Sequence, residues 1–473
     1  MASGLDQYCV LYPAIVRTEP FGRDWLDRLK QSIQRASDLF MVADVIELLP
    51  TVLAINGSNN YLSIELLLNG QSIWKNFGRV TTNGKPLVCW FQVINSGGIR
   101  ATYGPVEMRT LNRQYPGLWF DFADLLAYHL ILCIKQKCLS TPFQRMATKI
   151  VSKHAAGTPM TYFPAALQFA QKLHMAFKRR LLPNPNAVQW GIGLFDAATV
   201  DSAGLLAAPR KVVWLNMPTD RFWADPMLAA QDGTLFLFYE EFIFNKGIGT
   251  LCVTELRGFT ATVDCPAIDL EFEPEIKTHL SFPFVFQAQE HWFLIPENMQ
   301  SGQTNLYRCQ RFPDRWRMQA TLLTNVAGVD PVIFFHADLF WLFVGDGALG
   351  AQDNHLRLFY STAVDGTYNE HQHSPIKLGL RGSRMAGPII NEAGCLIRVA
   401  QDCSKIYGGS LVMFEINELS PTVYRETELH QLLPDIDSQF PLGLHSLYKQ
   451  PGIHFGAIDG LRKRPPTQAS RST

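Results

Sequence analysis

Two aspartates, 105 residues apart, stand in the same local setting, and their carboxyl groups could take part in acid–base chemistry. Asp225 and Asp330 each precede a proline that opens a short apolar segment, and a second segment with an acidic end follows. Close carboxylates push each other's pKa values apart, as catalysis by a general acid and a general base requires. An aspartate at the start of a strand can instead cap backbone N–H groups. Both interpretations stay open for Asp225 and Asp330.

This two-segment pattern occurs five times, and in each copy the second segment ends in one carboxylate. The five carboxylates are Glu240, Glu297, Asp346, Asp402 and Asp459. A turn at Asp232-Gly233 would place Asp225 opposite Glu240 in a hairpin. The same spacing puts Phe282 opposite Glu297, Asp330 opposite Asp346, Gly387 opposite Asp402 and Leu444 opposite Asp459. These carboxylates would either shape the mouth of a site or hold the connections between neighbouring repeats.

Basic and aromatic residues accompany the acids. Arg384, Arg398 and His445 are expected near the same site, where a guanidinium can bind a phosphate or a carboxylate by two parallel hydrogen bonds. Pairing with the acidic residues is the alternative. Trp223 offers an aromatic face that suits a sugar ring, or that packs between repeats. The predicted substrate-binding residues are Trp223, Glu240, Glu297, Arg384, Arg398, Asp402 and His445.

The element that must position these residues is a repeat of short strands. Its copies start at Asp225, Phe282, Asp330, Gly387 and Leu444, with separations of 57, 48, 57 and 57 residues. A period near 50 with several strands per unit is typical of a β-propeller, and five copies predict five blades. The inner strands of a propeller converge on one central funnel. Residues 189–195 precede the first copy and are expected to complete the last blade, which closes the ring.

The rest of the chain shows no repeat. Residues 1–140 predict a smaller α+β domain, with helices at 24–39 and 121–137 and hairpin turns at Asn69-Gly70 and Asn83-Gly84. Residues 141–187 predict a helical connector, and 463–473 a disordered tail. Within the connector, residues 161–182 predict a basic amphipathic helix that could contact an anionic membrane surface, or pack between two domains. The predicted fold is therefore mainly β: a five-bladed propeller at 188–462 preceded by these two regions.

The amino-acid composition limits the classes of partner that the protein is expected to bind. Forty-two basic residues balance 42 acidic ones, so we expect no nucleic-acid partner. Nine cysteines without metal-ligand spacing predict no disulfide framework and no bound metal, and nothing in the sequence calls for a cofactor. The first residues lack a basic segment followed by an apolar one, and the longest apolar run is too short to span a bilayer. The expected location is the cytoplasm, with the inner face of a membrane as an alternative.

The repeat motifs resemble five-bladed propellers of the arabinanase and β-xylosidase kind. Asp225-Pro226 and Asp330-Pro331 match the first and third motifs of those enzymes, which implies a general base at Asp225 and a pKa-tuning role for Asp330. The fourth motif carries the general acid as Glu-Gly-Pro, whereas this chain has Ala386-Gly387-Pro388. One general acid contributes about 10²–10⁴-fold to a rate, so the resemblance implies loss of ordinary glycosidase activity.

A closer resemblance, over about residues 188–462, is to the N-terminal propeller of the plant glucosamine inositolphosphorylceramide transferase family and its bacterial relatives. The matching stretches include residues 222–226, 279–284, 384–387, 398–404 and 443–446. The family's Arg-Pro-Ala-Gly appears as Arg384-Met385-Ala386-Gly387. In the plant proteins sugar transfer belongs to a separate C-terminal domain, and this chain is expected to end before such a domain.

Together these features predict a protein of glycan or glycolipid biosynthesis whose funnel binds a sugar, a phosphosugar or a glycolipid. If it is an enzyme, Asp225 and Asp330 would be the catalytic pair, Arg384 and His445 would receive an anionic leaving group, and the reaction would be glycosyl transfer rather than standard hydrolysis. The alternative is a non-catalytic carbohydrate-binding or scaffold propeller that has lost the general acid of a glycosidase-like ancestor. Simple hydrolysis stays open if another carboxylate such as Asp402 replaces the acid.

Overall fold

The computed structural model describes residues 63–68, 71–72, 87–95 and 98–108, and residues 188–465 with gaps at 198–210, 258–266, 348–351, 354, 393 and 450–451. The described strands fall into two compact units, one with β1–β4 and the other with β5–β27. The predicted helices at 24–39 and 121–137, the connector at 141–187 and the tail beyond residue 465 lie outside the described residues. In the described ranges, no helix has the length and hydropathy needed to cross a bilayer.

The first unit contains a four-stranded antiparallel sheet in the order β2-β1-β3-β4. Its strands are β1 (Ser63–Leu68), β2 (Gln71–Ser72), β3 (Leu87–Asn95) and β4 (Gly98–Met108). Leu68 lies opposite Gln71, which confirms the hairpin predicted at Asn69-Gly70. The turn predicted at Asn83-Gly84 lies outside the described residues, and β3 pairs with β1 and β4 rather than with β2.

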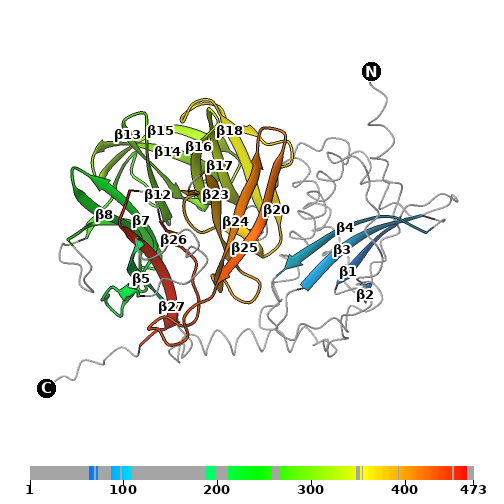
Figure 1. The fold of residues 1–473 in the computed structure, drawn as a ribbon, viewed down its shortest axis with the longest axis horizontal. Helices are drawn as coiled ribbons and strands as arrows, with labels where there is room; N and C mark the ends of the chain where they lie inside the picture. The colour runs from blue at the N-terminus through cyan, green and yellow to red at the C-terminus, as the bar shows by residue number, and fades with distance from the viewer. Residues whose placement is uncertain are drawn as a thin grey trace. The chain divides into compact units, whose positions relative to one another are not determined.

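The second unit is a ring of five sheets, each built mainly from antiparallel neighbours (Figure 1). The first blade holds β7 (Arg221–Gln231), β8 (Thr234–Ile243), β9 (Ile248–Leu256) and β10 (Ile268–Asp269). The second holds β12 (Ser281–Ala288), β13 (His291–Glu297), β14 (Gln303–Arg311), β15 (Arg315–Thr324) and, parallel to β15, β11 (Glu271–Glu273). The third holds β16 (Gly328–His336), β17 (Leu339–Asp346), β18 (His355–Ser361), β19 (Asn369–Glu370) and β20 (Lys377–Leu378).

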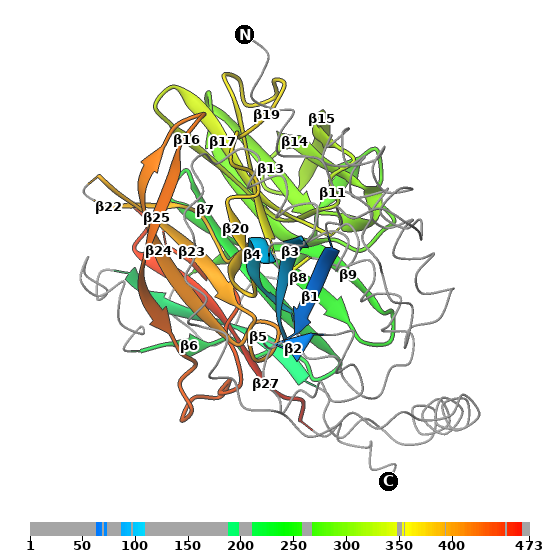
Figure 2. The ribbon, with the colours of Figure 1, turned by 90° about the vertical axis from the view of Figure 1, so that its right-hand side faces the viewer.

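The fourth blade holds β21 (Arg381–Met385), β22 (Ile390–Glu392), β23 (Cys395–Asp402), β24 (Ser410–Leu419) and β25 (Tyr424–Leu432). Figure 2 shows β23, β24 and β25 side by side in this blade. The fifth blade joins distant parts of the chain, in the order β26 (Leu447–Tyr448), β27 (Phe455–Lys463), β5 (Val188–Asp196) and β6 (Val213–Trp214).

The ring closes between the two ends of this unit. β27 pairs with β5 along its whole length, from Phe455 opposite Asp196 to Lys463 opposite Val188. The inner strands also contact one another in sequence, from β7 to β12, β16 and β21, and β26 returns to β7. The five-bladed propeller and its closure by residues 189–195 are therefore confirmed.

Aromatic side chains pack the blades against each other. Phe238 of the first blade lies edge-on to Trp316 of the second, with ring centroids 6.2 Å apart. Phe343 of the third blade meets Tyr424 of the fourth in the same way, at 6.1 Å. A strand covered on both faces reads as an almost continuous apolar run, and Phe340–Val344 of β17 is buried throughout. The packed faces hold the inner strands at fixed positions around the axis.

Candidate functional site

Three inner strands carry a β-bulge at the same place, just where the predicted acidic site begins. Asp225, Phe282 and Asp330 have φ angles of 55°, 45° and 46°, and each precedes a proline. The pairing register shifts on either side of each of them. A left-handed conformation in a residue other than glycine costs about 1–3 kcal/mol, and it persists only where the surroundings determine it. The surroundings here are hydrogen bonds to the neighbouring blades.

The bulges also correct the predicted register. Glu240 lies opposite Ala224 rather than Asp225, Glu297 opposite Ser281, Asp346 opposite Gly328, and Asp402 opposite Arg381. In the last blade the N–H of Asp459 donates to the carbonyl of Ser446 rather than lying opposite Leu444. Counting from the hairpin turn assumes a regular ladder, and an inserted residue breaks that assumption.

Asp225 connects three blades. Its Oδ2 accepts a hydrogen bond from the backbone N–H of Phe282 in the second blade, at 3.1 Å. Its Oδ1 accepts one from the hydroxyl of Ser446 in the fifth blade, at 2.9 Å, and lies 3.8 Å from Nδ1 of His445. Its own backbone N–H donates to Asp459 Oδ2 at 3.1 Å. The side chain is 6% exposed, so this carboxyl group is nearly sealed from water.

Asp330 makes a matching connection between the second, third and fourth blades. Its Oδ2 accepts hydrogen bonds from Nε of Arg384 at 2.8 Å and from Nε2 of Gln401 at 3.0 Å, both in the fourth blade. Its backbone N–H donates to Glu297 Oε2 at 3.0 Å. Arg384 also binds Asp353 at 3.2 Å and lies 3.6 Å from Glu297. The guanidinium of Arg384 thus faces three carboxylates. Of the two roles expected for Arg384, binding a ligand or pairing with the acidic residues, this contact is the second.

An aromatic group joins the two halves of the site. Tyr407 lies beneath the guanidinium of Arg384, 4.9 Å from its ring centroid, and meets His445 edge-on at 5.5 Å. The imidazole of His445 stacks on the indole of Trp190 at 3.8 Å. Tyr407 is half-buried, whereas Arg384 and His445, which it contacts, are buried. Asp225 and Asp330 therefore belong to one buried cluster, and Tyr407 packs against it.

Glu240 lies at the edge of the cluster beside His279. Nδ1 of His279 accepts the backbone N–H of Gly249 at 2.8 Å, so a neutral imidazole carries its proton on Nε2. That atom is 3.5 Å from Oε1 of Glu240, which makes no hydrogen bond within the described residues. His279 is partly exposed, whereas Glu240 is buried.

Burial dominates the acid–base behaviour of the site. It raises the pKa of Asp225 to about 6, against the opposing effect of His445. Burial likewise raises the pKa of Asp330 to about 7, although Arg384 acts the other way. Burial and the neighbouring acids, Asp225 first, raise the pKa of Glu240 well above its ordinary value. Burial would lower the pKa of His445, but Asp459 and Asp225 outweigh it and raise that pKa.

Three of the predicted substrate-binding residues lie in other networks. Trp223 donates its indole N–H to Glu241 at 3.0 Å and packs on Tyr239 within the first blade. Arg398 is fully buried and binds Glu426 through two hydrogen bonds. Asp402 pairs with Arg381 and with Gln431 at the end of the fourth blade. The structure brings together the other four predicted substrate-binding residues, Glu240, Glu297, Arg384 and His445, with the predicted catalytic pair Asp225 and Asp330.

Several members of the cluster were not among the predicted site residues. Asp459 and Ser446 could have been found from their repeat position and their place beside His445. The position of Trp190 could have been inferred from the predicted ring closure, since β5 places this residue in the fifth blade. Gln401 and Asp353 had no such signal, because their contacts arise only when the third and fourth blades meet.

Asp225, His445 and Asp459 offer ligand atoms within 4.8 Å of one another, a grouping that could hold a metal ion. Nδ1 of His445, however, lies 2.5 Å from Oδ2 of Asp459, which is a hydrogen-bond distance. Ligands at roughly 2.0–2.2 Å around a tetrahedral metal stand farther apart than this. In this arrangement a hydrogen bond joins the two groups.

Ala386, which stands where the resemblance to arabinanase-type propellers would place a general acid, is fully buried. Its backbone N–H donates to the carbonyl of Val399 at 3.0 Å, and its carbonyl accepts the N–H of Leu447 at 2.7 Å. A methyl group between two strands can transfer no proton, so an acid at this site has to come from another residue.

The fold and the site thus define a five-bladed propeller with a buried acidic cluster at the start of its inner strands. Residues 208–437 match the family model described as "Glucosamine inositolphosphorylceramide transferase 1, N-terminal". This confirms the resemblance drawn from the sequence motifs: the propeller is similar to the N-terminal part of that transferase.

Two plant relatives are similar to the chain. It is 35% identical over 212 residues to glucosamine inositolphosphorylceramide transferase 1 of Arabidopsis thaliana, covering 44% of this chain and 27% of that protein. It is 31% identical over 213 residues to the protein of the same name in Oryza sativa subsp. japonica, covering 44% and 28%. The chain spans about a quarter of the length of these relatives.

Solved structures with a similar chain trace include the catalytic domain of Coprinopsis cinerea GH62 alpha-L-arabinofuranosidase. It is 14% identical, with 57% of this chain and 81% of that chain covered and a TM-score of 0.35. A second is Cellvibrio cellulosa alpha-L-arabinanase complexed with arabinohexaose, 17% identical, with 43% and 77% covered and a TM-score of 0.32.

Proposed function

We propose that this protein acts in glycan or glycolipid biosynthesis and that its acidic cluster binds a sugar. The observation that carries the proposal is the meeting of Asp225 and Asp330 in one buried cluster with Tyr407 packed against it. Carboxylates and an aromatic face are the groups that bind the hydroxyls and C–H faces of a sugar. The name of the plant relatives, which refers to transfer of glucosamine, supports the same class of ligand.

The charge balance favours an amino sugar over a phosphosugar. Six carboxyl groups of the described residues gather here: Asp225, Glu240, Glu297, Asp330, Asp353 and Asp459. Arg384 and His445 are already paired with them. An added phosphate would meet this excess of acid with no unpaired cation, whereas an ammonium group would relieve it. The sugar is therefore expected to carry an amine, as glucosamine does.

If the cluster catalyses a reaction, Asp225 is its base. A pKa of about 6 leaves this carboxylate ionised at neutral pH. Each of its oxygens accepts one hydrogen bond from the protein and keeps a lone pair for a substrate proton. Glu240, whose pKa burial raises well above its ordinary value, would donate a proton, and His279 would restore it from solvent. The reaction class is glycosyl transfer.

Titration calorimetry on the full chain tests sugar binding. At pH 7.5 glucosamine should bind more tightly than N-acetylglucosamine, which lacks the ammonium group, and glucosamine 6-phosphate should bind weakly. Asp225→Asn should weaken glucosamine binding at least about tenfold, because a charged partner is lost. Asp402→Asn is the matched control, since its carboxylate pairs with Arg381 outside the cluster. Equal affinity in both variants, or preference for the phosphosugar, would contradict the proposal.

A non-catalytic carbohydrate-binding propeller is the second candidate, and the buried Ala386 favours it. The discriminating measurement incubates the protein with sugar-nucleotide donors and acceptor lipids and follows product by mass spectrometry. Product that disappears in Asp225→Asn supports a transferase. Glucosamine binding with no product from any donor supports the binding module.

A further inference from the structure

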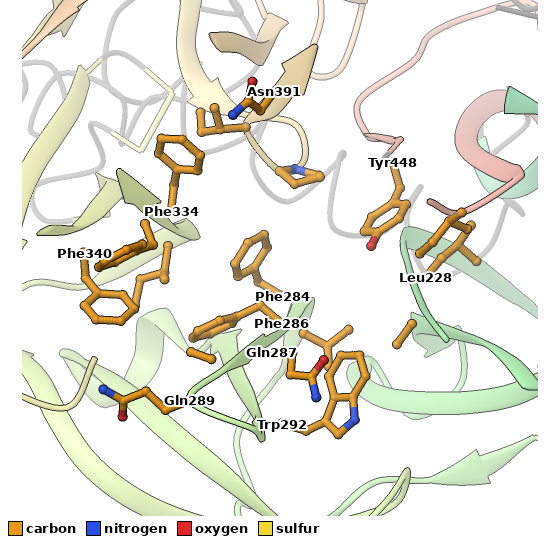
Figure 3. A pocket seen from close by; sticks show the side chains of 18 of the residues that line it. Leu228, Phe284, Phe286, Gln287, Gln289, Trp292, Phe334, Phe340, Asn391 and Tyr448 are labelled. Carbon is orange, nitrogen blue, oxygen red and sulfur yellow. The ribbon is translucent and has the colours of Figure 1, made fainter. Parts of the chain in front are cut away.

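A second site lies at the opposite ends of the same inner strands. A cavity of about 850 Å³ is lined by the later residues of β7, β12 and β16 together with parts of the fourth and fifth blades (Figure 3). Leu228 follows Asp225 by three residues, and Ile333 follows Asp330 by three. At about 3.3 Å per residue, the cavity begins roughly 10 Å below the acidic cluster. Its volume lies within the range of about 300–1,000 Å³ that is usual for ligand pockets.

The lining changes from apolar to polar between the interior and the mouth. The buried lining residues have apolar or aromatic side chains: Leu228, Ala229, Phe284, Val285, Ile333, Phe340, Pro388, Ile389 and Tyr448. Most of the exposed lining residues are polar, namely Gln287, Gln289, Asp338, Thr362 and Asn391, and the others are Ala230, Phe335 and Gly452. In Figure 3, Phe284 and Phe286 lie at the centre, between Phe334 and Phe340 on one side and Tyr448 and Leu228 on the other.

The charge of the mouth limits the ligand further. Among the residues described around the cavity, no lysine, arginine or histidine contributes to the lining, and Asp338 carries the one formal charge. A phosphate or carboxylate head would lack a cationic partner here and would be repelled by Asp338. Amide side chains at the mouth can both donate and accept hydrogen bonds to hydroxyl or amide groups.

We propose that this cavity binds a single hydrocarbon chain whose head group carries hydroxyl or amide groups and no negative charge. The chain would lie between the phenylalanine side chains of the second and third blades, and the head would remain at the mouth beside Gln287 and Asn391. The inference goes beyond sugar binding at the acidic cluster and does not depend on it. It adds a lipid-binding function at the other end of the propeller.

Calorimetry with 1-octanol, 1-nonanol and 1-decanol tests the proposal on the full chain. Each added methylene should tighten binding about fourfold while it enters the cavity. Decanoate should bind more weakly than 1-decanol because its charge finds no cation. Trp292 lines the cavity and provides a second readout. A bromine-labelled alkanol should quench the tryptophan fluorescence, and the quenching should diminish in Trp292→Phe.

Two tryptophan substitutions form a matched pair. Ala230 is an exposed residue of the cavity wall, so Ala230→Trp should narrow the mouth without disturbing the core and weaken 1-decanol binding by about tenfold. Gln319→Trp, exposed on the outer strand β15, should leave it unchanged. Asp225→Asn should also leave 1-decanol binding unchanged, which separates this test from that of the sugar site.

Three outcomes would overturn the proposal. They are an affinity independent of chain length, an equal loss of affinity in both tryptophan variants, and displacement of 1-decanol by maltose.

Discussion

Asp330→Asn separates the charge of the buried cluster from its shape. Oδ2 of Asp330 accepts hydrogen bonds from Arg384 and Gln401. The amide oxygen of an asparagine can accept both, so the contacts survive while the negative charge is lost. Arg384 keeps Asp353 as a hydrogen-bonded partner and Glu297 as a nearby charge. The variant should therefore fold, and what changes is the response of stability to pH.

The size of that response follows from the pKa of the carboxyl group. Burial raises the pKa of Asp330 to about 7 from an ordinary value of 3.8. Between these two values the folded protein holds a proton that the unfolded chain has released. The free energy of unfolding of the wild-type protein therefore falls as pH rises through this window. The fall is about 1.4 kcal/mol per pH unit from this group, and about 4 kcal/mol in total.

The asparagine variant lacks this titration, so it should gain about 4 kcal/mol relative to the wild-type protein between pH 4 and pH 8. Urea denaturation followed by tryptophan fluorescence at several pH values measures the difference. Asp402→Asn, which removes a carboxylate paired with Arg381 at the edge of the fourth blade, controls for the loss of one charge. If the profiles of Asp330→Asn and the wild-type protein run parallel, Asp330 is an ordinary ionised partner of Arg384, and burial does not govern the site.

The remaining predictions concern the cation, a glycine and the ligand. Arg384→Met should reduce the free energy of unfolding by about 3–5 kcal/mol at pH 7.5, because it leaves buried carboxylates unpaired. The loss should be smaller at pH 5 in the same denaturation assay. Gly387→Ala should fail to fold, since its Cβ would lie 2.0 Å from the carbonyl oxygen of Leu447 at a φ of 153°. Gly233→Ala, whose Cβ meets nothing within 4 Å, should lose only about 1–2 kcal/mol in thermal unfolding. Glucosamine binding should strengthen from pH 5 to pH 7, as Asp225 with a pKa of about 6 becomes ionised while the sugar keeps its ammonium group; calorimetry that gives a flat profile over this range would contradict this.

The blade pattern could be predicted because it is a local property of the sequence. Each copy has apolar residues on both sides of a turn. A hairpin can therefore be recognised from its own residues, without knowledge of its neighbours. The turn at Asp232-Gly233 is an example, since Gln231 pairs with Thr234 across it. Ring closure could also be predicted, because the strand at 189–195 had no partner before the first copy and the last blade lacked a strand.

The register at the site could not be predicted from spacing alone. Asp225, Phe282 and Asp330 adopt left-handed backbone conformations that disturb the pairing of each inner strand. The stabilising contacts come from neighbouring blades, as when the N–H of Phe282 donates to Asp225. A conformation that depends on a residue 57 positions away leaves no mark in the local pattern.

The acidic partners of the two arginines could not be predicted from the sequence either. Arg384 and Arg398 are both basic residues of the fourth repeat, yet Arg384 faces the central carboxylates and Arg398 binds Glu426 within its own blade. Both side chains are buried, so each guanidinium needs an acidic partner. The position of each arginine in its strand determines which acid it pairs with. Sequence reasoning could name the two possible partners, a ligand or an acid, but could not choose between them.

The acidic cluster depends on closure of the ring as well as on the inner strands. Trp190 lies on β5, whereas His445 lies just before β26, and their rings stack at 3.8 Å only because β27 joins these parts in one blade. His445 in turn contacts Asp225 and Asp459, so the base of the proposed reaction is held by the same contacts that close the propeller. Folding and site assembly are thus one event: a propeller open between β5 and β27 would keep its blades but would lose the stacked His445 beside Asp225.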